Sequence, residues 1–214
     1  RLLARGPRFR LQGEFIRDNA LAASGLLVGK IGGPSVKPYQ PPGLWNEVSL
    51  SGERFVQDKG ENLYRRSMYT YWKRSSPAPS MTIFDARTRE KCVLLRSRTN
   101  TPLQALVTLN DVQFVEASRA LAQRAIKSAE SVDQQIVTAF RLATGLHPRP
   151  VVLEILKEAY QEELVVFKED GERAKKLISL GETKRDESID AAQHAAMTIV
   201  TSMILNLDDT LTRG

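Results

Sequence analysis

The chain has 214 residues, of which 42% are apolar, and a formal net charge of +6 at pH 7. This length fits one large or two small domains, and the apolar content is enough for a buried core, which excludes a globally disordered chain. One cysteine and two histidines exclude an internal disulfide and a covalently attached c-type haem, and they argue against a zinc site made of protein ligands alone. We therefore expect no metal and no cofactor in this chain. No run approaches the roughly 18 apolar residues that a membrane helix needs.

The positive charge is concentrated in the first half of the chain. Residues 99–214 carry 13 Lys and Arg against 17 acids, whereas residues 64–98 carry nine against two, a local charge of +7. Such a field attracts anionic partners, for example nucleic acid, an acidic polysaccharide, phosphate or an anionic membrane face. The alternative is that these arginines pair inside the molecule with carboxylates and backbone carbonyls.

The N-terminal part predicts one helix followed by a long loop. Apolar residues recur at helical spacing over residues 11–28, and the glycines within 29–33 would end that helix. Residues 29–45 hold four Pro and four Gly, which excludes a helix or a central strand. Because this loop also contains Tyr39 and Trp45, we expect it to pack on the body of the protein rather than to act as a free linker.

The next segment is ambiguous. Side chains alternate over residues 64–73, which favours an extended strand, although a helix is compatible with the same residues. The sequence SSPAPS at 75–80 breaks any regular element, and residues 81–84 are compatible with a second short strand. These features leave room for one short β-hairpin in the segment.

From Thr101 the chain becomes regularly helical. Thr101 is a capping residue, Pro102 suits the first helical position, and Gln104 completes a capping box for a helix that reaches about Leu109. Caps and apolar periodicity predict five more helices, at about 111–128, 131–143, 149–168, 171–180 and 186–205.

The predicted fold class is mainly α. A multi-helix body at 101–207 would carry a long irregular, Arg- and aromatic-rich insertion at 29–100, with the N-terminal helix of residues 1–28 packed on the last helices. We take residues 1–214 as a single domain or as the C-terminal fragment of a larger one. We expect residues 1–98, which we call the loop-rich half, not to fold alone, because this half lacks the periodic apolar surface that a core of its own would need.

Several long motifs occur in a fixed order: NALAASGLLV, KIGGPSVKPYQPPGLW, LYRRSMYTYWKR, RSRTNTPLQALVTLND and LNLDDTLTR. Through them the chain resembles the C-terminal region of a bacterial family best known from Planctomycetes, the domain of unknown function fifteen-fifty-three. The resemblance implies a large parent protein, exported to the periplasm or cell surface, with an upstream region that often carries a cytochrome c module. Any haem c would lie there, because this chain has no C-x-x-C-H motif. The resemblance also implies partner genes linked to polysaccharide and sulfated-glycan degradation, but no established activity.

Basic and polar side chains of the loop-rich half are the first candidate ligand-binding residues. Arg96 and Arg98 precede the helix that begins at Thr101, where unpaired backbone N–H groups and two guanidinium groups would hold a carboxylate, sulfate or phosphate. The alternative is that they bridge to Asp85, Asp111 or carbonyls and fix the loop. The candidates are Arg65, Arg66, Arg96, Arg98 and Asn100.

Aromatic side chains are the second set of candidates. Tyr39, Trp45 and Trp72 would stack on sugar rings or bases. The alternative is that they fill a small satellite core beneath the loop.

Other chemistry-bearing residues give weaker signals. The acids present no spacing that singles out a glycosidase pair. Asp208 and Asp209 are better explained as the end of the last helix than as a cation site. We expect His147 to be exposed, His194 to lie at a helix interface, and Cys92 to be buried and inert.

The leading hypothesis is an accessory ligand-binding or structural domain of an exported multi-domain protein, one that binds anionic polysaccharide beside its own upstream region. The alternative is part of a polysaccharide-active enzyme whose site the upstream region completes. No catalytic motif decides whether the chain is enzymatic. A third hypothesis is nucleic-acid binding, which is disfavoured because no helix-turn-helix or RNA-binding signature occurs.

Overall fold

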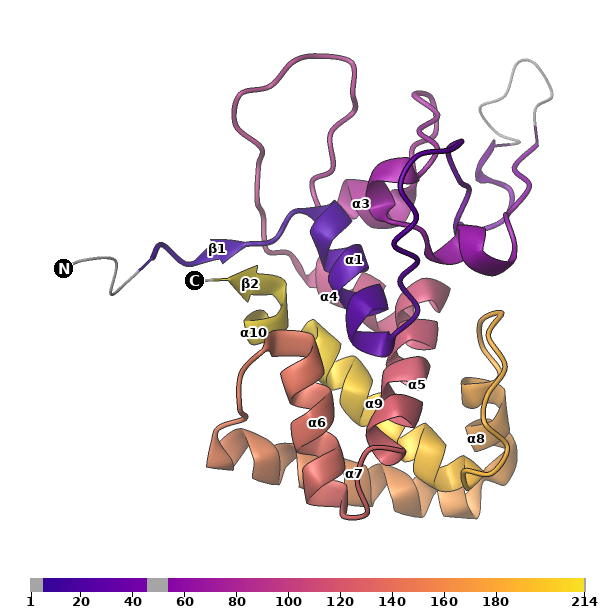
Figure 1. The fold of residues 1–214 in the computed structure, drawn as a ribbon, viewed down its shortest axis with the longest axis vertical. Helices are drawn as coiled ribbons and strands as arrows, with labels where there is room; N and C mark the ends of the chain where they lie inside the picture. Colours follow the sequence, from indigo (N-terminus) through magenta and orange to yellow (C-terminus); the bar gives the residue numbers. More distant parts are fainter. Residues whose placement is uncertain (1–5, 46–53, 214) are drawn as a thin grey trace.

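The computed structural model describes residues 6–45 and 54–213. Over these ranges the protein is mainly helical, with a small two-stranded antiparallel sheet, as the sequence predicts. Figure 1 shows a helical body below and the irregular segment, with its projecting loops, above.

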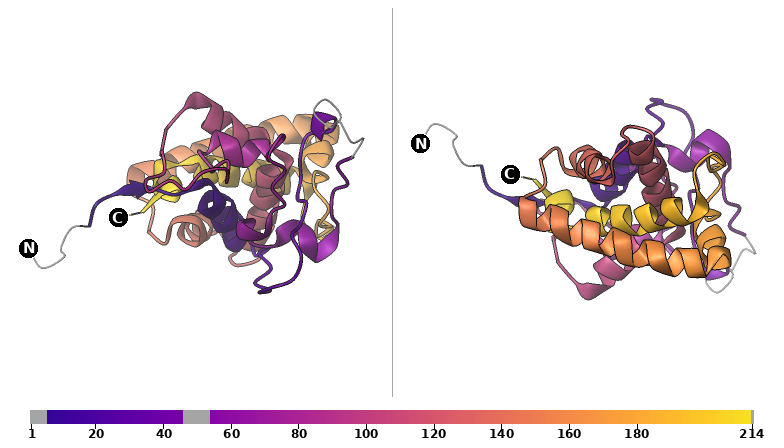
Figure 2. Two further views of the ribbon diagram at one scale, coloured as in Figure 1. Left: turned by 90° about the horizontal axis from the view of Figure 1, so that it is seen from above. Right: turned by 90° about the horizontal axis from the view of Figure 1, so that it is seen from below.

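Two helices form the centre of the body. Helix α5 (Val112–Ile126) packs along α9 (Ala191–Asn206), and Figure 2 shows α7 lying beside α9 on the lower face. Because α9 is surrounded by other helices, even His194 and Thr201 are buried on it. The remaining helices of the body are α6 (Val132–Thr144), α7 (Pro150–Glu169) and α8 (Gly171–Ile178).

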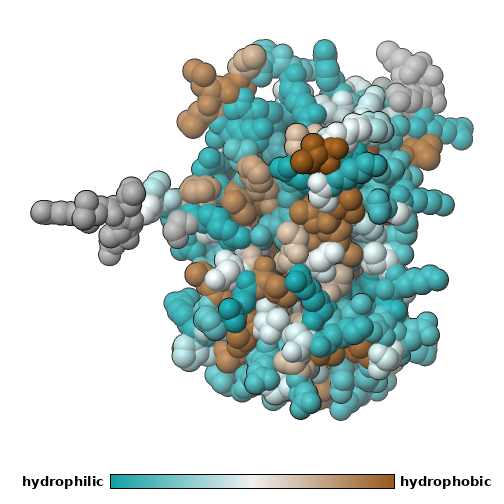
Figure 3. Space-filling view, in the orientation of Figure 1, coloured by the Kyte–Doolittle hydropathy of each residue, from teal (hydrophilic) through white to brown (hydrophobic). Residues whose placement is uncertain are grey.

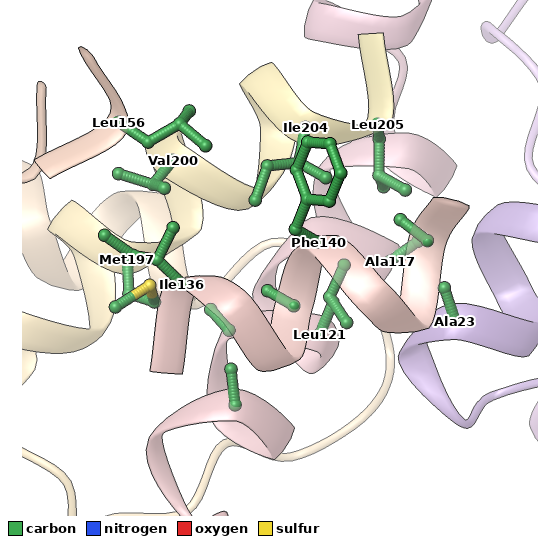
Figure 4. Packing of buried hydrophobic residues seen from close by; sticks show 14 of the residues in the cluster. Ala23, Ala117, Leu121, Ile136, Phe140, Leu156, Met197, Val200, Ile204 and Leu205 are labelled. Carbon is green, nitrogen blue, oxygen red and sulfur yellow. The ribbon is translucent and has the colours of Figure 1, made fainter. Parts of the chain in front are cut away.

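The main core lies between α5, α6, α7 and α9. Leu121, Ile136 and Ile204 are fully buried there, and Figure 4 shows their side chains meeting beside Phe140 and Met197. Each such side chain contributes on the order of 2 kcal/mol by leaving water. The alanines of α9 keep the helices close together, as the run of small residues predicted.

The predicted helices of this half are confirmed, with ends that differ by a few residues. The largest difference is at α9, which begins at Ala191 rather than at 186. Asp190 is its capping residue, and its carboxylate accepts a hydrogen bond from the Gln193 N–H at 3.0 Å. A capping acid four residues into the expected helix explains the later start.

Helix α1 (Gly13–Ser24) packs on α5 and α6, so the expectation that it lies on the last helices was wrong. Its buried face includes Ile16 and Ala20, which join the main core. It ends at Gly25 and not at residue 28 as predicted, because Gly25, with a φ of 80°, forms a left-handed cap that favours glycine.

The sheet joins the two ends of the described chain. Strand β1 (Phe9–Arg10) pairs antiparallel with β2 (Thr212–Arg213), directly after α10 (Asp208–Leu211). It is therefore not the hairpin for which the sequence left room in the irregular segment. Arg8 pairs with both Asp208 and Asp209, at 2.8 and 3.0 Å, which gives these acids a structural role.

The irregular segment contains short helices instead of the expected strands. Residues 64–73 pass through two 3₁₀ turns, η1 (Gly60–Tyr64) and η2 (Ser67–Tyr69), and residues 81–84 fall largely within α3 (Pro79–Ile83). The alternating side chains do not line two faces of a sheet. Some of them contact α1, and others contact residues 29–45, which we call the Gly/Pro-rich loop. The segment ends at α4 (Pro102–Asn110), which begins at the predicted position with Pro102 in its first turn. The predicted capping box is wrong, because the Thr101 side chain makes no capping hydrogen bond and Gln104 donates to Ile83 and Thr99 instead.

A buried arginine on α1 holds this segment. The Arg17 side chain is 3% exposed. Its guanidinium donates to the Gln113 side chain on α5 and to the backbone carbonyls of Arg65 and Leu63, both at 2.7 Å. Asp18, the next residue, accepts from the Ser67 N–H at 2.7 Å. Burial lowers the pKa of Arg17 to about 10, so the guanidinium is charged at neutral pH.

A second arginine extends this connection to the Gly/Pro-rich loop. The Arg65 guanidinium donates to the carbonyls of Pro34 and Gly32, and it stacks on the Tyr69 ring, 3.9 Å from its centroid. Arg17 on α1 therefore fixes residues 63–67, and Arg65 in turn fixes the loop. The alternative that arginines pair internally is confirmed for Arg65, which is 2% exposed.

A buried carboxylate on α5 holds the other side of the segment. Glu116 Oε1 accepts hydrogen bonds from the Tyr64 hydroxyl at 2.9 Å and from the Thr183 N–H at 2.7 Å. Glu116 also lies 3.6 Å from Arg119. Gly181 passes so close that a Cβ there would lie 2.2 Å from the Glu116 carboxyl carbon, and its φ is 92°.

Substituting Gly181→Ala is expected to destabilise the protein by about 3 kcal/mol, because left-handed strain adds to a clash with a carboxylate that is held in place. Gly145→Ala is the matched control. Its φ is 79°, but the space around it is open, so strain alone should cost about 1 kcal/mol. Urea denaturation measures both free energies of unfolding. Equal losses in the two variants would contradict the predicted clash.

Candidate functional site

Two adjoining cavities open on the loop-rich half. The arginine cavity has a volume of about 430 Å³, and the aromatic cavity has a volume of about 380 Å³. They adjoin because Met68 and Arg89 line both, and we call the pair the aromatic–arginine groove. The arginine cavity is lined by Gln12, Glu14, Phe15, Asp18, Arg66, Met68, Arg87, Arg89 and Arg96. The aromatic cavity is lined by Ser35, Met68, Tyr69, Thr70, Tyr71, Trp72, Arg74 and Arg89.

The arginine cavity keeps an excess of positive charge. Its two acids already have partners: Glu14 accepts two bonds from Arg96, at 2.9 and 3.0 Å, and Asp18 accepts from Ser67. Arg66 makes no side-chain hydrogen bond or ion pair within residues 6–45 and 54–213. This guanidinium is therefore available to an anion at the cavity.

The aromatic cavity presents a fixed indole ring. Trp72 donates from Nε1 to the Thr88 carbonyl at 3.0 Å, and one side of it packs on the small cluster around Met81. The Arg89 guanidinium lies 5.0 Å from the Trp72 ring centroid. Arg89 has a φ of 61°, a backbone conformation that non-glycine residues seldom adopt. An indole next to a guanidinium is suited to a ligand that has both an apolar ring face and negative charge.

Three of the predicted site residues lie in this groove, namely Arg66, Arg96 and Trp72. Arg65 does not, because it is buried against the Gly/Pro-rich loop. The Arg96 side chain is 26% exposed and forms an ion pair with Glu14. It therefore helps to fix the groove wall and has few N–H donors left for a ligand.

The other two predicted aromatics, Tyr39 and Trp45, do not line the groove. Trp45 is 2% exposed, and the ammonium groups of Lys37 and Lys73 lie 5.1 and 4.2 Å from its ring centroid. Tyr39 is half-buried, and its hydroxyl accepts from the Glu182 N–H at 2.8 Å. The alternative of a satellite core describes Trp45 well.

Arg98 and Asn100 are exposed near the start of α4. The Arg98 guanidinium lies 5.4 Å from the Phe9 ring centroid, and Asp85 accepts from the Thr99 N–H at 2.7 Å. The space enclosed by Arg96, Arg98 and their neighbours is too small for a water molecule. An anion at this helix start would therefore have to bind at the surface.

Sequence reasoning missed Arg87 and Arg89 as groove residues. Their contribution to the local charge of +7 was visible, but nothing in the pattern showed that the loop would fold back on Trp72. Cys92, expected to be buried, is exposed in the loop between α3 and α4. Leu94 and Leu95 are also exposed there, and Figure 3 shows hydrophobic surface at the tip of this loop.

A second group of titratable residues is buried between α5, α9 and residues 182–185. Burial is the main cause that raises the pKa of Tyr39 to about 12, and the pKa of Tyr64 is raised as well, with Glu116 adding to both shifts. Perturbed values of this kind occur in active sites and in structural networks alike. Here the hydrogen bonds of Glu116 go to Tyr64 and Thr183 of this chain, which indicates a structural network.

His194 belongs to the same network. Its Nε2 lies 3.0 Å from the Arg119 carbonyl, and since a carbonyl only accepts, Nε2 carries the proton. Burial is the main cause that lowers the pKa of His194, and the charges of Arg119 and Arg185 lower it further. His194 lies between helices, as expected, and His147 is exposed.

The described part of the chain holds no group of three or more His, Cys, Asp and Glu placed to bind a metal ion. None of its helices is long and apolar enough to cross a membrane.

Comparison with known proteins gives one result. A family model described as PSD1, protein of unknown function (DUF1553), matches residues 1–160. No curated protein and no solved structure matches the chain.

Stability is expected to fall as the pH drops from 7.5 to 5.5, in part because of His194. The folded-state pKa of His194 is lowered, so below about pH 6.5 the unfolded chain takes up a proton that the folded chain does not. The full effect of one proton is about 1.4 kcal/mol per pH unit. Urea denaturation across this range should show a smaller slope for His194→Gln than for the unmodified chain. The control, His147→Gln, should keep the original slope, and a loss of slope in the control alone would contradict the assignment.

Proposed function

The chain belongs to the PSD1 family of proteins of unknown function (DUF1553), and from this premise we propose that it binds an anionic polysaccharide through the aromatic–arginine groove. It would act as an accessory domain of an exported multi-domain protein, at the periplasm or cell surface, next to its upstream region. The observation that carries the proposal is the contact between Arg89 and Trp72 at the point where the two cavities adjoin.

The two cavities supply complementary interactions. The apolar face of a sugar ring would stack on Trp72, as sugars do on indole rings. A sulfate or carboxylate on the same or the next sugar would face Arg66 and Arg89, which bind such groups through paired N–H donors. A neutral polysaccharide would use only the first of these interactions and should bind more weakly.

A second candidate is an enzyme that acts on the same polysaccharide. Glu14 and Asp18 favour it, because both carboxylates line the arginine cavity one helical turn apart on α1. Each is already bonded within the chain, to Arg96 and to Ser67. The reacting groups would therefore come largely from the upstream region.

Binding is tested by calorimetry in 150 mM NaCl with a sulfated carrageenan, with alginate and with neutral dextran. Trp72→Ala and Arg66→Gln should each lower affinity for one of the two anionic polymers about tenfold, since the loss of one stacking or charged contact corresponds to roughly 1.4 kcal/mol. Arg141→Gln is the matched control. Arg141 is exposed on α6 outside the groove, and the variant makes the same change in net charge as Arg66→Gln.

Equal losses for Arg66→Gln and Arg141→Gln would contradict the groove, because they would indicate a response to net charge alone. Dextran that binds as tightly as the anionic polymers would contradict the role of the arginines. Tighter binding of single-stranded DNA, with a steep fall in affinity as salt rises, would instead favour nucleic-acid binding. Cleavage of the polymer by the full-length parent, lost in Glu14→Gln, would favour the enzyme.

A further inference from the structure

A separate cavity of about 440 Å³ lies at the opposite end of α1. It opens between the last turn of α1, one face of α5 and residues 183–184. Glu14 lines the groove and Ser24 lines this cavity, and ten helical residues separate them by about 15 Å. The cavity is thus distinct from the proposed polysaccharide site.

The lining of this cavity is unusually one-sided in charge. Four of its residues are cations, namely Arg119, Arg124, Lys127 and Lys184, and no Asp or Glu lines it. Two carboxylates beside the cavity pair with two of these cations: Asp186 pairs with Lys127, and Glu116 lies 3.6 Å from Arg119. The other two cations, Arg124 and Lys184, line the cavity and make no ion pair within the described residues.

Two of these cations are held in place by the fold. Arg124 donates to the Ala23 carbonyl at 3.0 Å, and Arg119 donates to the Thr183 carbonyl at 2.6 Å. The remaining N–H groups of both guanidiniums extend the donor set beyond these bonds. Lys184, in contrast, is exposed and makes no ion pair within the described residues.

One buried donor next to the cavity lacks an acceptor in the described part of the chain. The Arg119 side chain is 1% exposed, and its Nε has no hydrogen-bond partner. Gln123 lines the cavity and accepts from the Asp186 N–H through Oε1 at 2.8 Å, which directs its amide NH₂ away from that bond. An unpaired buried donor is costly, and an anion that reached Arg119 Nε from the cavity would satisfy it.

We propose that this cavity binds a tetrahedral oxyanion, sulfate or phosphate, either free or as a monoester. Lys184 and Arg124 supply the positive charge that neutralises the anion, and Gln123 donates a hydrogen bond. Such an anion would tie the last turn of α1 and residues 183–184 to α5, and it would thereby stabilise the fold by mass action.

The test is calorimetry with sodium sulfate and sodium phosphate on the whole chain, at an ionic strength held constant with NaCl. Sulfate or phosphate should bind and should raise the thermal midpoint more than chloride does. The double variant Lys184→Gln/Arg124→Gln should lower the affinity at least tenfold. Lys184→Gln alone changes an exposed residue that makes no ion pair among the described residues, and it should lower affinity without loss of stability even if the double variant folds poorly.

The matched control is Lys176→Gln/Arg141→Gln, which removes the same two charges from exposed positions outside the cavity. It should bind sulfate as the unmodified chain does. Trp72→Ala should also bind sulfate normally, which separates this site from the polysaccharide groove. Glucose 6-sulfate or glucose 6-phosphate that binds more tightly than the free ion would identify a monoester, and equal or weaker binding would identify the free anion.

Three outcomes would overturn the proposal. The first is no heat of binding and no stabilisation beyond chloride. The second is an equal loss of affinity in the cavity variant and in the matched control, which would indicate a general response to charge. The third is loss of sulfate binding in Trp72→Ala, which would place the anion in the groove.

Discussion

The buried guanidinium of Arg17 is the interaction on which the arrangement of the loop-rich half depends. Taking this charge out of water is costly, and the cost is offset by the Asp18 carboxylate 3.8 Å away and by Gln113 and the carbonyls of Leu63 and Arg65, which accept its hydrogen bonds. These carbonyls belong to backbone with few regular partners of its own. One side chain on α1 thus fixes the position of residues 63–67, and through them the Met68 and Trp72 side chains that form the groove.

Two further residues, Arg65 and Tyr64, link residues 63–67 to neighbouring segments on opposite sides. Arg65 fixes the Gly/Pro-rich loop through the carbonyls of Pro34 and Gly32. On the other side Tyr64 donates to Glu116, and the same carboxylate holds Thr183. The loop-rich half is therefore attached to α1 and α5 by these polar bonds and by a small apolar cluster of Leu21, Leu63 and Tyr64. The groove and the cavity lined by Ser24 lie near opposite ends of α1, at the borders of this attachment.

The features that could be predicted from the sequence are those set by neighbouring residues, namely helix positions and apolar faces. Pro102 marked the start of α4 correctly and apolar periodicity identified the body, whereas the cap at Asp190 was not predicted. Arg66, Arg96 and Trp72 were found as groove residues because charge and aromatic content are visible without a fold. Pairings over long distances were not predictable, since nothing near Arg17 in the sequence indicates Gln113. The alternating side chains at 64–73 gave a wrong strand prediction for the same reason. These side chains contact residues that are distant in the sequence and do not form the two faces of a sheet.

Hydrogen exchange in the unmodified chain and in Arg17→Met tests the central claim most directly. The amides of Val28 and Tyr71 form hydrogen bonds within the loop-rich half, to the carbonyls of Tyr64 and Val36. If Arg17 holds this half in place, their exchange should accelerate on the order of a hundredfold, which corresponds to the roughly 3 kcal/mol expected for breaking a buried charged network. Amides of α5 and α9 should remain protected. Unchanged exchange at both loop amides, or equal acceleration in α5 and α9, would contradict the account.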